Sequence, residues 1–155
     1  MTEKKEKKYI IDNPVLMAEW NWKKNNELGL DPKTLTVGSN KKAWWKCNKG
    51  HEWQSIINNR NKGRGCPYCV ERKVLKGFND ITTKTPNLAK EWNYEKNADL
   101  KPENFMPNSH KKVWWKCSKG HEWQATIANR NKGRNCPICN TESNTSFPGY
   151  AILFY

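Results

Sequence analysis

The 155-residue chain lacks any long apolar segment, and hydrophobic residues make up only 35% of it. A membrane-spanning helix needs about 20 consecutive apolar residues, so the composition argues against a transmembrane protein. The N-terminus, MTEKKEKK, is charged where a signal peptide carries its apolar segment. These absences predict a cytoplasmic protein that does not enter a membrane.

Acidic residues are also scarce, because 15 Asp and Glu face 28 Lys and Arg and leave a formal charge of +13 at pH 7. A chain of this length forms one ordinary domain or two small ones, and small domains bury too little apolar surface to fold without a further constraint. Disulfides are rare in a reducing cytoplasm. We therefore interpret the six cysteines as metal ligands rather than as three disulfides.

An internal repeat organises the chain. Residues 41–69 recur at 111–139 with a constant offset of 70 positions, and a second matching block begins at Pro14 and again at Pro86. Most of the positive charge lies within these repeats. The predicted domains are a disordered basic leader over 1–11, one repeat unit over 12–75, a second over 76–141 and an apolar C-terminal tail over 142–155.

Each repeat predicts a short helix followed by a β-hairpin. Asn13 and Thr85 each precede a proline, which is typical of a helix N-cap with proline at the first helical position. Two segments of β character follow, separated by a turn that contains a glycine. These segments are 43–46 with 51–54, and 113–116 with 121–124. The predicted fold class is therefore a pair of small α+β units, each a short helix plus a hairpin, stabilised by metal.

Each hairpin places one Cys and one His across its turn. In both copies a Cys-Pro-x-Cys turn follows, with 14 residues between the His and the first Cys of that turn. Four such ligands suit tetrahedral zinc in a closed structural Cys3His site. The sequence thus predicts two Zn²⁺ ions per chain. The predicted ligands are Cys47, His51, Cys66 and Cys69 in the first copy, and Cys117, His121, Cys136 and Cys139 in the second.

A catalytic zinc site would need an open coordination position and a nearby general base. Glu52 and Glu122 directly follow the histidine ligands, but adjacent strand residues point to opposite faces. These carboxylates are therefore expected to lie away from the metal. The residues predict no catalytic group, and we expect the chain not to be an enzyme.

Basic residues recur in register around each predicted metal site. A rigid scaffold that carries such clusters favours contacts with nucleic-acid phosphates. The alternative is that the charge only keeps the protein soluble. The candidate phosphate contacts are Lys41, Lys42, Arg60, Lys62 and Arg64 in the first copy, and Lys111, Lys112, Arg130, Lys132 and Arg134 in the second.

The nine tryptophans allow two interpretations, because large aromatic rings either build a core or stack on unpaired bases. Since aliphatic residues are few, we expect Trp20, Trp45, Trp53 and their counterparts in the second copy to form the cores. Adjacent strand residues face opposite ways, so one member of each Trp-Trp pair should be more exposed. That residue is the candidate for base stacking.

Three motifs together resemble the tandem zinc-ribbon or treble-clef zinc finger repeat family. They are P-x-L-x-x-E-W-x-x-x-x-N, K-K-x-W-W-K-C-x-x-G-H-E-W and R-x-K-G-x-x-C-P-x-C. The resemblance covers nearly all of residues 12–141. In that family such repeats often precede a nuclease domain similar to very-short-patch-repair or homing endonucleases. The resemblance implies DNA recognition by the repeats and supports zinc binding by both quartets. It also implies a helix after the last ligand pair, which the residues favour over 70–76 in copy one but not in copy two.

Residues 145–148, Thr-Ser-Phe-Pro, resemble the start of that nuclease domain, but Gly149 and Tyr150 replace the expected acidic position and helix. The tail is therefore interpreted as a truncated beginning of a nuclease domain. Two alternatives to an independent DNA-binding module stay open. The chain could be the targeting portion or remnant of an endonuclease, or it could bind a partner protein through exposed tryptophan and its apolar tail.

Overall fold

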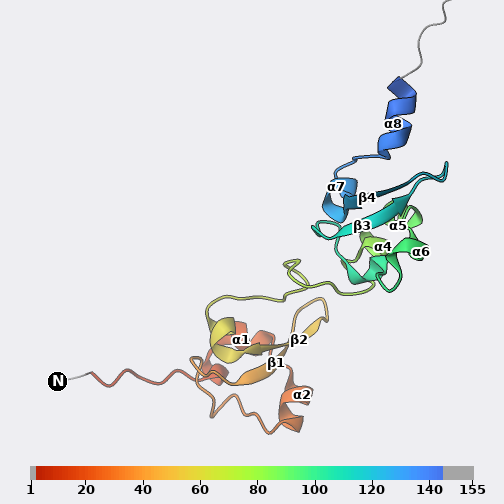
Figure 1. The fold of residues 1–155 in the computed structure, drawn as a ribbon. Helices are drawn as coiled ribbons and strands as arrows, with labels where there is room; N and C mark the ends of the chain where they lie inside the picture. The colour runs from red at the N-terminus through yellow and green to blue at the C-terminus, as the bar shows by residue number, and fades with distance from the viewer. Residues whose placement is uncertain (1–2, 145–155) are drawn as a thin grey trace, which may run out of the picture. The chain divides into compact units, whose positions relative to one another are not determined.

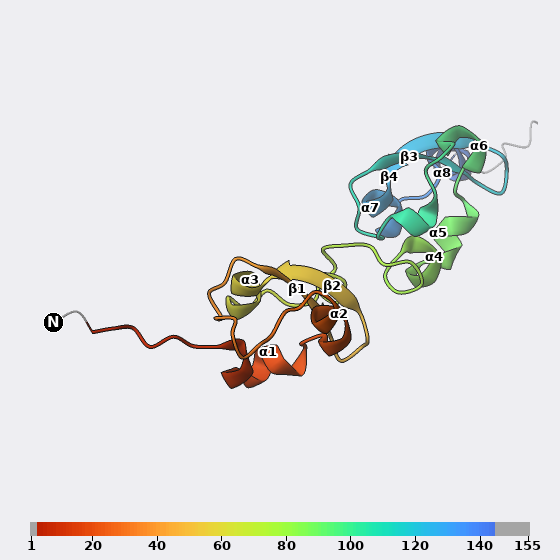
Figure 2. The ribbon, with the colours of Figure 1, turned by 90° about the horizontal axis from the view of Figure 1, so that it is seen from below.

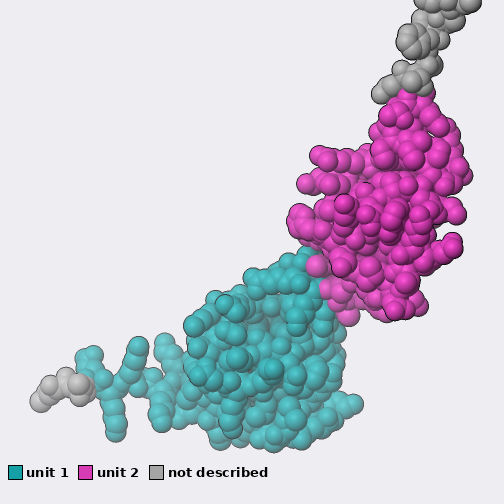
Figure 3. Space-filling view, viewed as in Figure 1, with its two compact units in different colours: residues 1–73 teal, residues 74–155 magenta. Residues whose placement is uncertain are grey.

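The computed structural model describes residues 3–144. The expected C-terminal tail over 142–155 thus lies outside the described residues from position 145 onward. The chain divides into two compact units between Lys73 and Val74, referred to below as unit 1 and unit 2 (Figure 3). The expected boundary lies two residues later, after residue 75.

Unit 1 contains one short 3₁₀ helix, three short α-helices and one hairpin. The Asn13 side chain caps the first α-helix by accepting hydrogen bonds from the backbone N–H groups of Val15 and Leu16, as predicted. The elements of unit 1 are η1 (Ile10–Asp12), α1 (Pro14–Ala18), α2 (Trp22–Glu27), β1 (Lys42–Lys46), β2 (Glu52–Ile56) and α3 (Ile57–Asn61) (Figure 1).

Unit 2 has the same hairpin and following helix, but it begins with an α-helix where unit 1 has η1, and it also contains a second 3₁₀ helix and a C-terminal helix. Thr85 precedes its proline helix but does not cap it, because its hydroxyl donates to the Ile81 carbonyl of the preceding helix. The elements of unit 2 are α4 (Ile81–Lys84), α5 (Pro86–Lys90), α6 (Tyr94–Asn97), η2 (Pro102–Asn104), β3 (Lys112–Lys116), β4 (Glu122–Thr126), α7 (Ile127–Asn131) and α8 (Pro137–Asn144) (Figure 1).

The predicted hairpins are present in both units as two-stranded antiparallel sheets. Trp45 lies opposite Trp53 in the first, and Trp115 lies opposite Trp123 in the second. The turn glycine, Gly50, has a φ of +85°, a left-handed conformation that costs other residues free energy. Figure 2 shows α1 and α2 beside the β1–β2 hairpin, whose first strand alternates between buried and solvent-facing residues.

The tryptophan cores form as predicted. Trp20 is 4% exposed, Trp45 is 0% and Trp53 is 5%, and the first two rings meet edge to face with centroids 5.4 Å apart. The Trp45 indole N–H donates to the Ser55 carbonyl, so its polar atom is satisfied inside the core. Trp92, Trp115 and Trp123 repeat this arrangement in unit 2.

The expected disordered leader extends less far than residue 11. Ile10 is fully buried, its N–H donates to the Leu35 carbonyl, and Tyr9 pairs with Thr36. Ile81 occupies the corresponding place in unit 2, where its N–H donates to the Phe105 carbonyl. Each unit therefore begins with an isoleucine that closes its core.

The helix that the resemblance implies after the last ligand pair is absent from unit 1, where it was predicted over 70–76, and present in unit 2, where the residues left it in doubt. In unit 1, the chain makes a single helical turn, closed by a hydrogen bond from Val70 N–H to the Cys66 carbonyl, and Glu71 then adopts a φ of +55°. This left-handed residue ends the turn. In unit 2, the turn continues into α8. Across residues 3–144, no helix is long and apolar enough to cross a membrane.

Candidate metal centres and basic surface

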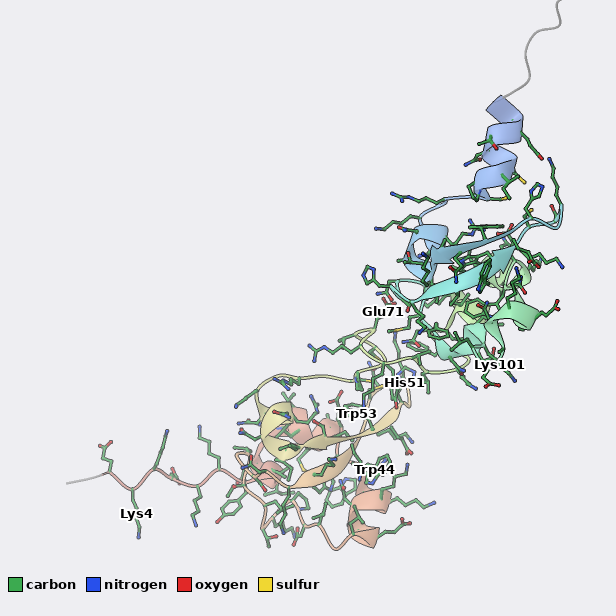
Figure 4. All side chains as sticks on the ribbon, viewed as in Figure 1. Lys4, Trp44, His51, Trp53, Glu71 and Lys101 are labelled. Atoms are coloured by element: carbon green, nitrogen blue, oxygen red, sulfur yellow. The ribbon has the colours of Figure 1, made fainter. Side chains whose placement is uncertain are left out.

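The hairpin turn brings the first two predicted ligands together. Cys47 directly follows β1 and His51 directly precedes β2. The backbone N–H of Cys47 donates to the His51 carbonyl at 3.0 Å, and the N–H of Gly50 donates to the Cys47 carbonyl at 2.9 Å. Figure 4 shows His51 at the end of the strand that carries Trp53. The backbone of the turn therefore fixes both ligand positions.

The remaining two ligands, Cys66 and Cys69, come from the turn after α3 and lie against the hairpin. The Cys47 and Cys69 sulfur atoms are 3.8 Å apart, and the His51 Nδ1 atom lies 3.7 Å from the Cys66 sulfur and 3.4 Å from the Cys69 sulfur. A tetrahedral zinc ion, with Zn–S of about 2.3 Å and Zn–N of about 2.05 Å, separates sulfur pairs by about 3.8 Å and sulfur–nitrogen pairs by about 3.5 Å. The distances match such an ion.

Unit 2 has the same geometry. The separation of the Cys117 and Cys139 sulfurs is 3.8 Å, and His121 Nδ1 lies 3.7 Å from the Cys136 sulfur and 3.4 Å from the Cys139 sulfur. In both quartets all ligand atoms lie within 4.8 Å of one another. The two Cys3His groups thus fit two zinc ions.

The thiols of each quartet influence one another strongly when no cation is bound. Burial, followed by the neighbouring Cys66 and Cys47 thiols, raises the pKa of Cys69 to about 11. Burial also acts to raise the pKa of Cys47, but hydrogen bonds with the backbone of His51 and Lys49 and with the Cys69 and Cys66 side chains together outweigh it and lower that pKa. A divalent cation removes this conflict, because it stabilises every thiolate at once.

The carboxylates next to the histidine ligands point away from the quartets, as predicted. Glu52 lies 2.6 Å from the Lys24 ammonium group and accepts a hydrogen bond from the Asn21 amide at 3.1 Å. These two partners lower the pKa of Glu52. Glu122 forms the equivalent ion pair with Lys96 at 2.5 Å. Neither carboxylate is placed to act as a base on a metal-bound molecule.

The two centres differ just outside the quartets. In unit 2, the His121 Nε2 atom lies 3.7 Å from a carboxylate oxygen of Glu142 on α8, and the Lys119 ammonium group lies 3.0 Å from that residue's other oxygen. In unit 1, the His51 ring packs edge-on against Tyr68 with centroids 5.8 Å apart. Carboxylates beside a ligand histidine orient it in many zinc sites.

Two of the predicted phosphate contacts, Arg60 and Arg130, require correction. The Arg60 side chain is 4% exposed, forms an ion pair with Glu19, and lies 5.2 Å from the Trp45 ring centre and 5.6 Å from that of Trp53. Burial lowers the pKa of the Arg60 guanidinium group, and the Cys66 sulfur acts in the opposite direction. Arg130 has the same environment and pairs with Glu91. These arginines stabilise the cores and are not exposed to a ligand.

Burial of these two arginines was not predicted, because both lie in a basic segment. The segment begins as a helix, α3 or α7, and Ile57 and Arg60 are three positions apart on one face of it. Each repeat also carries a glutamate before its first core tryptophan, at Glu19 and Glu91. That pairing, together with the helical spacing, is the signal from which burial could have been inferred.

The other eight candidate basic residues are exposed. They comprise Lys41, Lys42, Lys62 and Arg64 in unit 1, and Lys111, Lys112, Lys132 and Arg134 in unit 2. Two of them, Lys112 and Arg134, line a surface groove of about 420 Å³ in unit 2 together with Gln124 and Asn129. The sequence prediction did not include these two amide residues.

One tryptophan in each pair is more exposed than its neighbour, as predicted. Trp44 is half-buried, and the Lys24 ammonium group lies 3.9 Å from the centre of its ring. Lys96 covers Trp114 in the same way at 4.2 Å. The most exposed aromatics described in the structure are instead Trp22 at 50% and Tyr94 at 58%, which occupy equivalent positions.

A hairpin and a Cys-Pro-x-Cys turn whose four ligands fit one zinc ion define each unit as a small zinc-binding module. Residues 16–72 and 88–142 match the family described as "Probable Treble clef zinc finger domain", and the chain belongs to this family.

Two curated relatives match part of the chain. The SPbeta prophage-derived uncharacterized protein YomD of Bacillus subtilis (strain 168) is 32% identical over 105 residues, which are 66% of this chain and 35% of YomD. A putative endonuclease of Escherichia phage T5 is 26% identical over 108 residues, 67% of this chain and 34% of that protein. The aligned region thus spans about a third of the length of each relative.

Proposed function

We propose that the chain is a nucleic-acid-binding module, specific for DNA, in which zinc supports the fold and exposed basic residues contact phosphates. One observation carries the proposal: the eight exposed candidates are identical between the two units, residue for residue, at an offset of 70 positions. Within residues 3–144, none of the eight forms an ion pair. Their charge is therefore available to a ligand.

The surrounding fold holds this charge at fixed positions. The Ile57 N–H donates to the Lys41 carbonyl at 2.9 Å, which joins the start of α3 to the segment that carries Lys41 and Lys42. The Arg64 N–H donates to the Asn59 carbonyl at 3.2 Å and so attaches the following loop to the same helix. Because the backbone is fixed in this way, little backbone entropy is lost when a phosphate binds.

Two metal centres saturated by protein ligands support a structural role for zinc rather than a catalytic one. A catalytic zinc keeps a position for water or substrate, whereas four protein ligands complete a tetrahedral site. With three thiolates and one dication, each centre lowers the formal charge of the chain by one and leaves a strongly basic protein.

The match to a phage protein named as a putative endonuclease favours a second candidate, in which the module directs a nuclease to DNA. Incubation of the zinc-loaded chain with duplex DNA and Mg²⁺ tests whether the chain itself cleaves DNA. Intact DNA is the result expected of a binding module, and cleavage that a Lys62→Ala/Arg64→Ala variant weakens would contradict the proposal that this chain is not itself an enzyme.

Salt-dependent binding tests the proposal. Each phosphate contact on duplex DNA contributes about −0.9 to the slope of log affinity against log salt, so six to eight contacts predict a loss of about 10³-fold or more between 50 and 200 mM salt. Matched single-stranded DNA and RNA oligonucleotides provide the comparison for the DNA preference.

Charge variants make the test specific to these residues. The variant Lys62→Ala/Arg64→Ala/Lys132→Ala/Arg134→Ala should flatten the slope by about 3.6. Lys33→Gln/Lys101→Gln, which alters exposed lysines outside the eight, is the matched control and should leave the slope within about one contact of the unaltered chain. An affinity that barely responds to salt would refute the phosphate-contact proposal.

A further inference from the structure

The groove on unit 2 places two cationic side chains beside two carboxamides. Lys112 and Arg134 supply the charge, and Gln124 and Asn129 supply groups that both donate and accept hydrogen bonds. Its volume of about 420 Å³ is within the range of small-ligand sites, about 300–1,000 Å³. The groove therefore offers more than a charged surface.

Neighbouring elements hold all four side chains at this groove. Lys112 begins β3 and lies opposite Thr126, the last residue of β4, while Gln124 lies two positions earlier on the same face of that strand. The Thr126 hydroxyl caps α7 by accepting a hydrogen bond from the Asn129 N–H at 3.2 Å. The Arg134 N–H then donates to the Asn129 carbonyl at 3.2 Å. The groove is thus built on the hairpin and on a capped helix.

The carboxamides of Gln124 and Asn129 have no hydrogen-bond partner among the described residues. Other amide side chains of unit 2 do have partners, because Asn97 bonds both the N–H and the carbonyl of Trp114, at 2.7 and 2.8 Å. The two groove amides therefore have donors and acceptors left for a ligand.

Unit 1 carries the same four residue types at the same offset of 70 positions, namely Lys42, Gln54, Asn59 and Arg64. The surrounding positions differ, since Ile56 stands where unit 2 has Thr126 and Gly65 where it has Asn135. The amide–cation set is thus common to both units, whereas other groove-lining positions are not.

From this arrangement we infer that Gln124 and Asn129, with Gln54 and Asn59 in unit 1, contact the edge of an adenine base while the adjacent Lys and Arg hold the phosphates that flank it. Carboxamides match the paired donor and acceptor on the adenine edge, whereas cations alone carry no sequence information. This inference rests on the proposed nucleic-acid binding and adds base specificity to it.

Selection from a duplex DNA library with a randomised central segment tests the inference, with the full zinc-loaded chain as the probe protein. The unaltered chain should enrich adenine-containing sites over the same sites with adenine replaced, by about 5- to 150-fold per contact. The four-amide variant, Gln54→Ala/Asn59→Ala/Gln124→Ala/Asn129→Ala, should lose this enrichment and keep the same salt slope, because no charge is removed.

Asn26→Ala/Asn87→Ala removes two exposed carboxamides outside the groove and is the matched control. It should retain the enrichment, and zinc content and thermal unfolding should establish that every variant is folded. Two results would overturn the inference while the proposed function survives: salt-dependent binding without any enrichment, or enrichment that the four-amide variant retains. A chain that shows no salt-dependent binding would instead refute the proposed function, and this inference with it.

Discussion

Removal of the Glu19 carboxylate should destabilise unit 1 far more than removal of an exposed charge. Glu19 is the counterion of Arg60, whose side chain is 4% exposed, so Glu19→Ala leaves a buried guanidinium group without its ion pair. Breaking a buried pair in this way costs about 3–5 kcal/mol. Because the Glu19 side chain is itself 27% exposed, we expect the lower end, about 3 kcal/mol.

The reverse substitution should cost less. Arg60→Met removes the buried charge and keeps an unbranched side chain between Trp45 and Trp53, while water can solvate the partly exposed Glu19 carboxylate. We expect a loss of about 1–2 kcal/mol. In the double variant, the buried charge is absent and the total cost should be smaller than the sum of the two single costs by at least about 1 kcal/mol.

Urea unfolding of the zinc-saturated protein, followed by tryptophan fluorescence, measures these differences. The transition of unit 2 should not move, because Glu91 and Arg130 are unaltered, and Arg64→Ala provides an exposed control with an expected change within about 0.5 kcal/mol. Equal losses for Glu19→Ala and Arg64→Ala, or strictly additive losses in the double variant, would refute the assignment of Arg60 to the core.

Two further predictions concern the metal centres and the hairpin. The pKa of the Cys69 thiol is about 11 when no metal is bound, so zinc must displace a proton from this thiol at pH 6–8. The affinity for zinc, measured by competition with a chromophoric chelator, should therefore fall at least about tenfold for each unit by which the pH is lowered. An affinity that does not depend on pH would contradict thiolate ligation. Asn25→Ala should lower the free energy of unfolding in urea by about 2–3 kcal/mol, because the Asn25 side chain forms hydrogen bonds with both the N–H and the carbonyl of Trp44. The control Asn26→Ala, at an adjacent exposed residue, should lower it by less than about 0.5 kcal/mol. Similar losses for the two variants would contradict the bridging role of Asn25.

The features predicted correctly from the sequence are those repeated as chemically specific patterns. The ligand spacing identified all eight zinc ligands, because Cys and His side chains at a fixed interval leave few other interpretations. The β-type segments around a glycine turn correctly predicted the hairpins, and the scarcity of aliphatic residues correctly predicted the tryptophan cores. Local residue types were sufficient here, because a short hairpin depends mainly on its own turn and pattern.

The errors occurred where a distant residue determines the outcome. Arg60 lies in a basic segment that is typical of phosphate contacts, but in the folded chain it pairs with Glu19, which lies 41 positions earlier. Ile10 lies outside the recognisable repeat, and its burial depends on a backbone contact with Leu35. The path of the chain after Cys69 depends on the left-handed backbone conformation of Glu71. This conformation cannot be predicted from the residue type, because glutamate rarely adopts it.

The groove amides were missed for a different reason. Gln124 and Asn129 are ordinary surface residues, and only the hairpin register and the cap of α7 bring them beside Lys112 and Arg134. Their identity with Gln54 and Asn59 was visible in the repeat, but an identity between repeats does not distinguish a surface role from a structural one.

The central claim, that two zinc ions complete the two units, is tested most directly by native mass spectrometry of the folded chain. The expected mass is that of the polypeptide with two zinc ions, one for each Cys3His group. Cys66→Ser should leave one ion, bound by the intact group of unit 2. A folded chain with native tryptophan fluorescence and no zinc, or two ions retained with equal affinity after Cys66→Ser, would contradict the claim.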